Sequence, residues 1–92
     1  MVLIKRLNEG TYLAHICEHI IIAIQNKIGI DVSYGKAREV ENDHYYIIFQ
    51  YIYENTAIEI SKFAIDIVNS LIKKIPINYE ERLDFIRGIL KD

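Results

Sequence analysis

Residues 12–28 read YLAHICEHIIIAIQNKI, and this stretch decides the fold. Its apolar residues recur at the spacing of a helix: Leu13, Ile16, Ile20, Ala23, Ile24 and Ile28. Gly29 follows where a glycine commonly ends a helix. The number of isoleucines indicates burial on more than one side. We therefore predict a long helix here, against which the rest of the chain packs.

Two strands are predicted after this helix. Residues 30–40 have the pattern of a strand with Val32 and Tyr34 on one face, and residues 45–53 are dense in Tyr, Ile and Phe. The polar residues 41–44 between them indicate a turn, which predicts a β-hairpin. Both faces of its second strand carry apolar residues. We expect the helix to cover one face and a second subunit to cover the other.

Two further helices complete the predicted fold. The first begins near Glu54 and carries an apolar stripe: Ala57, Ile60, Ala64, Ile67, Val68 and Leu71. Pro76 ends it, and Asn78 caps a short last helix over residues 79–90 that turns Leu83, Ile86 and Leu90 inward. The expected fold class is α+β: a β-hairpin packed against the first long helix, a second long helix and a short C-terminal helix. The 92 residues predict a single domain spanning 1–92.

Composition narrows the function. With 11 basic and 13 acidic residues the net charge is −2, which disfavours nucleic acid as a partner. Cys17 is the only cysteine, as expected in a reducing compartment, and no apolar run approaches membrane-spanning length. No phosphate-binding loop motif occurs, so ATP-dependent ligase chemistry is not expected of this chain alone. We expect a cytoplasmic protein that makes no membrane contact.

His15-Ile16-Cys17-Glu18-His19 fits the pattern H-x-x-E-H on the predicted helix. Histidines at i and i+4 share a helix face and can bind one Zn²⁺, as in the inverzincin peptidases. Glu18 is then placed to act as general base toward a metal-bound water. The alternative is an ordinary solvated helix face, because so short a motif also arises by chance. Cys17 points off this face and is interpreted as a small buried hydrophobe.

A catalytic zinc needs a third protein ligand, and the first helix does not supply one. Five acids elsewhere are candidates: Glu39, Glu54, Glu59, Glu80 and Glu81. The residues alone do not choose among them.

Residues 9–25 resemble the cyanophycin synthetase signature E-G-T-x-x-G-H-x-x-E-H-x-A-L-E-L-Q. Residues 28–39 are similar to that family's A-G-x-x-V-G-F-G-R-T-R-E, and residues 46–51 to its Y-x-V-V-F-E-Y strand. The matches run in order with similar spacing, so the chain resembles the amino-terminal module of cyanophycin synthetases. Departures from the pattern include Ala14 in place of a glycine, Ala23 in place of an acid of the signature, and Lys36 and Ala37 in place of Arg and Thr.

The resemblance implies a module of a cytoplasmic ligase that builds a polymer of aspartate with arginine side groups. Such modules help to hold the polymer, and in some members the H-x-x-E-H site is similar to a zinc peptidase that trims it. Carried over by position, His15 and His19 become zinc ligands and Glu18 the catalytic base. By analogy with peptidases whose third ligand comes from a later helix, Glu80 and Glu81 are the favoured metal-ligating acids.

Two functions are therefore expected. One is a stand-alone domain with a zinc-dependent peptidase site that acts on a cyanophycin-like polypeptide. The other is a non-catalytic module in which the motif is vestigial, forming a homodimer or binding a separately encoded ligase. A carboxylate close enough to His15 and His19 to share a metal ion would distinguish the first from the second.

Overall fold

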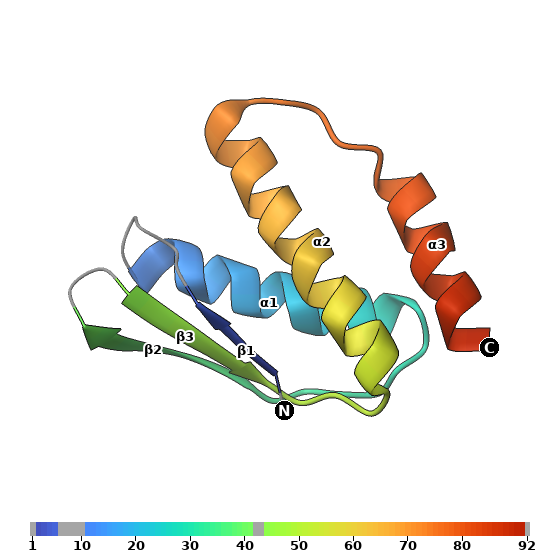
Figure 1. Cartoon of the computed structure of the whole chain (residues 1–92), viewed down its shortest axis with the longest axis horizontal. Helices are drawn as coiled ribbons and strands as arrows, with labels where there is room; N and C mark the ends of the chain where they lie inside the picture. The colour runs from blue at the N-terminus through green and yellow to red at the C-terminus, as the bar shows by residue number, and fades with distance from the viewer. Residues whose placement is uncertain (1, 6–10, 42–43, 92) are drawn as a thin grey trace.

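The structure is a computed structural model that describes residues 2–5, 11–41 and 44–91. Six elements follow one another along these residues: β1 (Val2–Lys5), α1 (Thr11–Lys27), β2 (Gly35–Glu41), β3 (His44–Phe49), α2 (Glu54–Lys73) and α3 (Tyr79–Lys91). Figure 1 shows α1 lying along the sheet, with α2 crossing α1 and α3 standing beside α2. The predicted α+β class, with the hairpin packed on the first helix, is confirmed.

The sheet has three antiparallel strands in the order β1-β3-β2. β1 was not anticipated from the sequence, and it pairs with β3 on the side opposite β2, with Val2 against Phe49 and Lys5 against Tyr46. β2 and β3 form the predicted hairpin, whose register shifts between Glu39 and Glu41. Among the described strands, β2 is therefore left at one edge of the sheet.

Both hairpin strands are shorter than the sequence predicted. β2 begins only at Gly35, because the amides of Ser33 and Tyr34 donate to Gln50 Oε1 at 3.1 and 3.3 Å instead of forming a strand ladder. The amide of Val32 likewise donates to Asn26 Oδ1 at 3.2 Å. β3 ends at Phe49, directly before the glutamine that holds this segment. Side-chain acceptors thus bind the amides of Val32, Ser33 and Tyr34.

The core lies between the sheet and the helices. From α1 it takes Ala14, Cys17, Ile21 and Ile24, and from β3 it takes the alternate residues Tyr45, Ile47 and Phe49. Gly29 has φ +93°, in the left-handed region that glycine adopts most readily, and so confirms the predicted end of α1. Ala23 is exposed rather than inward-facing.

The α2 stripe was predicted correctly up to Val68, but Leu71 is 60% exposed because the core ends before the last turn of the helix. Asn78 caps α3 as predicted: its Oδ1 accepts from the Glu81 amide at 3.1 Å. Leu83 and Ile86 of α3 join the same buried cluster as α1 and α2. Among the helices of the described chain, none is long and apolar enough to cross a membrane.

Candidate functional site

α1 carries the H-x-x-E-H residues along the border of β2. His15 and His19 are exposed, whereas Glu18 is half-buried. A Cβ built on Gly35 would lie 2.7 Å from Glu18 Cγ and 3.2 Å from Glu18 Oε2, so the Glu18 side chain rests on the backbone at the start of β2. The three residues therefore form a polar ridge beside the edge strand, and Glu18 is fixed by packing against that strand.

Cys17, between these residues, belongs to the core. Its side chain is fully buried, as predicted. Burial raises the pKa of the Cys17 thiol from 9.0 to about 12. The thiol stays protonated near neutral pH, as expected of a buried structural cysteine.

The zinc site expected from the sequence requires a third ligand close to His15 and His19. Within residues 2–5, 11–41 and 44–91, no three His, Cys, Asp or Glu residues are grouped so that they could hold a metal ion. A catalytic zinc requires three protein ligands, so the described residues do not fit one.

The candidate third ligands are engaged or placed elsewhere. The Glu81 amide donates to Asn78 Oδ1, and the Glu81 carboxylate accepts from Asn78 Nδ2 at 3.3 Å. The Glu59 carboxylate pairs with Lys62 at 3.5 Å. Glu80 lines a groove that it shares with Ala23 and Lys27, at the carboxyl half of α1. Glu39 and Glu54 are exposed on β2 and at the start of α2. The structure brings His15, Glu18 and His19 together, but brings none of these acids to them.

The free edge of β2 is a second feature that the sequence did not indicate. The Gln50 amide donates to the Tyr34 carbonyl at 2.9 Å, which makes this a hydrogen-bonded pair. Because such pairs alternate along an antiparallel ladder, the peptide groups of Lys36 and Arg38 face β3. Those of Gly35, Ala37 and Glu39 face outward, where an extended chain can pair with them.

Charges of opposite sign flank this edge. Lys36 and Arg38 are exposed, and their register places them on the sheet face that lies away from α1. Gly35, Ala37 and Glu39 pair with the buried residues of β3 and so belong to the face toward α1, where Glu18 also lies. The edge strand thus separates a cationic side from an acidic side.

A buried glutamine holds α1 to the end of the hairpin. Gln25 is 1% exposed, and its Nε2 donates to the Gln50 carbonyl at 2.9 Å. Gln50 in turn holds the amides of Ser33 and Tyr34. This connection fixes the segment that enters β2, and with it the position of the edge beside the ridge.

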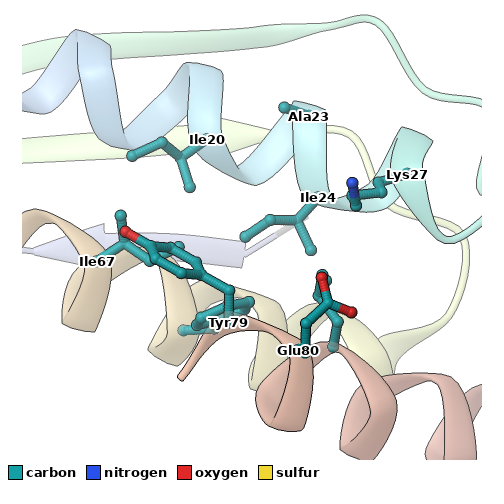
Figure 2. A pocket seen from close by; sticks show the side chains of 9 residues that line it. Ile20, Ala23, Ile24, Lys27, Ile67, Tyr79 and Glu80 are labelled. Carbon is teal, nitrogen blue, oxygen red and sulfur yellow. The ribbon is translucent and has the colours of Figure 1, made fainter. Parts of the chain in front are cut away.

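A groove of about 280 Å³ lies between α1, α2 and α3 (Figure 2). Its floor is formed by Ile24, Phe63, Ile67 and Leu83, all buried. Lys27 and Glu80 both lie at one side of the groove in Figure 2. The sequence did not indicate this groove. The groove arises because α3 packs on α2 and stays apart from α1, and no local pattern predicts that arrangement.

Comparison with known proteins places this geometry in a family. The model of the cyanophycin synthase-like N-terminal domain matches residues 1–73. The chain belongs to this family. The matched residues end with α2, so they include the sheet, α1 and the H-x-x-E-H ridge. The helix α3 lies after the matched residues.

The curated relatives are much longer proteins. Over 70 residues the chain is 36% identical to the cyanophycin synthetase of Geminocystis herdmanii (strain PCC 6308), covering 75% of this chain and 8% of that protein. It is 29% identical over 70 residues to the cyanophycin synthetase of Synechocystis sp. (strain ATCC 27184 / PCC 6803 / Kazusa), with the same coverage. The chain therefore spans about 8% of the length of these relatives.

The resemblance seen in the sequence is thus confirmed, and the structure gives several signature positions a packing role. Gly35 leaves room for Glu18, Gln25 joins α1 to the hairpin, and Gly29 ends α1. Glu9 and Gly10, which begin the signature, lie outside the described residues.

Proposed function

We propose that this domain binds a cyanophycin-like polypeptide without cutting it, by accepting the polymer as an added strand along the free edge of β2. The observation that carries the proposal is the outward-facing backbone of Gly35, Ala37 and Glu39 beside the polar ridge of α1. An unpaired strand edge supplies main-chain hydrogen bonds to an extended peptide, and flanking side chains supply specificity.

The charges beside the edge suit such a polymer. An aspartate backbone that carries arginine through one amide bond keeps one carboxylate and one guanidinium in each unit. Lys36 and Arg38 offer cations to the carboxylates, and Glu18 and Glu39 offer carboxylates to the guanidinium groups. Each side of an added polymer strand would thus meet a charge opposite to one of its own groups.

Proline substitution tests the edge directly. Proline has no amide hydrogen, so Ala37→Pro removes an outward donor without removing a ladder bond to β3. The matched control is Ala37→Val, which keeps the amide and suits a strand. Binding of soluble aspartate–arginine oligomers is measured by NMR titration, with circular dichroism to check the fold.

We expect Ala37→Pro to weaken binding about tenfold and Ala37→Val to bind like the parent, as expected for one lost hydrogen bond of about 1 kcal/mol plus local misfit. The Lys36→Glu, Arg38→Glu double variant is expected to lose most binding, and parent affinity is expected to fall with salt. Full affinity in the proline variant would show that the polymer does not use this edge. Sedimentation at the same concentrations shows whether a homodimer formed through two β2 edges competes with the polymer.

A zinc-dependent peptidase is the second candidate, favoured by the exposure of both His15 and His19 on one helix. It predicts about one zinc per chain that is lost in His19→Ala, and cleavage of the oligomers that is lost in Glu18→Gln. The binding proposal predicts no cleavage, with or without added zinc, and oligomer binding that survives His19→Ala. Stoichiometric zinc together with cleavage sensitive to Glu18→Gln would replace our proposal with the peptidase.

A further inference from the structure

The groove between the three helices combines an apolar interior with two opposite charges at its mouth. Its floor residues Ile24, Phe63, Ile67 and Leu83 are at most 7% exposed, so the groove reaches the core. Its wall includes Tyr79, whose ring lies 6.1 Å from that of Phe63. An interior of this kind favours a branched aliphatic or aromatic group.

The mouth is zwitterionic. Lys27 closes α1 and Glu80 lies in the first turn of α3, and both line the same side of the groove in Figure 2. Neither residue takes part in the ion pairs found in the described part of the chain, which involve Lys62, Arg82 and Arg87. An ammonium and a carboxylate that line one groove without pairing leave room for a group that carries both charges.

Ala23 keeps the mouth open. It lies on the groove rim one turn before Lys27 and is exposed. The family signature has an acid at this position, whereas here the carboxylate at the rim comes from Glu80 on α3, which lies beyond the matched residues 1–73. The acidic group at this groove is therefore supplied by the helix that follows the family match.

We propose that this groove binds a free L-α-amino acid with a large apolar side chain. The α-carboxylate binds Lys27, the α-ammonium binds Glu80, and the side chain lies against Ile24 and Ile67. A free amino acid carries a carboxylate and an ammonium that are opposite in charge to Lys27 and Glu80 of the groove, whereas a residue inside a polypeptide carries neither main-chain charge. This site is separate from the β2 edge and does not depend on the polymer-binding proposal.

The test is a set of NMR titrations of the full chain. L-Leucine is compared with isocaproate, which lacks the ammonium group, and with isoamylamine, which lacks the carboxylate. For so small and partly exposed a ligand we expect a dissociation constant on the order of 1 mM. The amides of Ala23, Lys27 and Glu80 are expected to shift, and each leucine analogue to bind about tenfold more weakly.

Variants assign the contacts. Lys27→Met and Glu80→Gln are each expected to weaken leucine binding roughly fivefold, the range of one partly solvated charged hydrogen bond. Lys62→Met and Asp84→Asn are matched controls, because both residues are charged and lie outside the groove. Ala23→Phe, at an exposed position, is expected to fill the mouth and abolish binding with the fold intact.

Three results would overturn the proposal. One is leucine producing no shifts at these amides. Another is an analogue that binds as tightly as leucine, which would show that the protein does not recognise the charged group that the analogue lacks. The third is Nα-acetyl-arginine binding in place of leucine, which would assign the groove to arginine side groups of a polymer. Oligomer binding in Ala37→Pro is scored separately, so either proposal can fail alone.

Discussion

The side chain of Glu18 rests on the backbone of Gly35. The space between them is too small for a methyl group, since a Cβ on Gly35 would lie 2.7 Å from Glu18 Cγ. This contact joins the H-x-x-E-H helix to the edge strand of the sheet. The Glu18 side chain, and not the backbone conformation, accounts for a glycine at position 35, because Gly35 is not among the described residues with positive φ.

Gly35→Ala is expected to destabilise the domain by about 1–3 kcal/mol, the usual range for overpacking a fixed site. In a Glu18→Ala background the same change is expected to cost less than about 0.5 kcal/mol, because the obstructing Cγ is gone and alanine loses less backbone entropy than glycine. Urea unfolding of the parent, both single variants and the double variant gives the coupling energy. Additive costs would contradict the contact.

The Cys17 thiol makes stability depend on alkaline pH. Its pKa rises from 9.0 in an exposed thiol to about 12 in the folded protein, so between these values the folded state holds a proton that the unfolded state has lost. The free energy of unfolding therefore falls as pH rises through this window, by up to about 1.4 kcal/mol per unit. Below pH 9.0 this contribution is fully present. Unfolding curves of the parent and of Cys17→Ala are expected to differ in slope only above that pH, and equal slopes would contradict the burial effect.

The Gln50 side chain is expected to slow hydrogen exchange of the amides in the segment that enters β2. Gln50→Leu removes the acceptor for the Ser33 and Tyr34 amides and is expected to cost about 1–2 kcal/mol. Gln50→Glu keeps an acceptor oxygen and serves as the control. Hydrogen exchange is the measurement: both amides exchange faster in the leucine variant than in the glutamate variant. Equal exchange in the two variants would show that the side chain does not hold this segment.

Arg82 links α3 to α2 through two contacts. It pairs with Asp66 at 2.8 Å and lies 4.8 Å from the centre of the Phe63 ring. Arg82→Ala is expected to cost about 1–2 kcal/mol, and Asp66→Asn less than about 1 kcal/mol, because the ion pair is partly exposed while the ring contact remains. Thermal unfolding at low and high salt separates the two: only the Asp66 contribution is expected to shrink with salt. A salt-insensitive cost of Asp66→Asn would argue against the ion pair.

The sequence predicted those parts of the fold that follow from periodicity. The apolar repeat over α2 up to Val68, the capping residue Asn78 and the alternating Tyr45, Ile47 and Phe49 lie as expected. The helix α1 was also predicted, but its buried apolar residues are Ala14, Cys17, Ile21 and Ile24, so only Ile24 of the predicted repeat is buried. β1 was missed because four residues are too few to show a period. The length of β2 was overestimated because the Gln50 side chain, from another part of the chain, accepts the amides of Ser33 and Tyr34, which no local pattern reveals.

The candidate site was likewise predicted only where local spacing determines it. Helical spacing correctly placed His15, Glu18 and His19 together, since they lie within one turn. The contact of Glu18 with Gly35, the free edge of β2 and the position of Glu80 beside Ala23 depend on how elements pack, and packing is not encoded at fixed spacing. The one sequence signal for the groove was Ala23, a small residue at a position where the family signature has an acid.

α3 begins after the residues that match the family, yet its Leu83 and Ile86 are buried with Phe63 and Val68 of α2. A fragment cut where the sequence likeness ends would expose that side of α2 to water and would tend to aggregate. The packed unit is therefore longer than the part of the chain that matches the family. A transplant of this domain into another protein is expected to need the residues through α3 to remain folded.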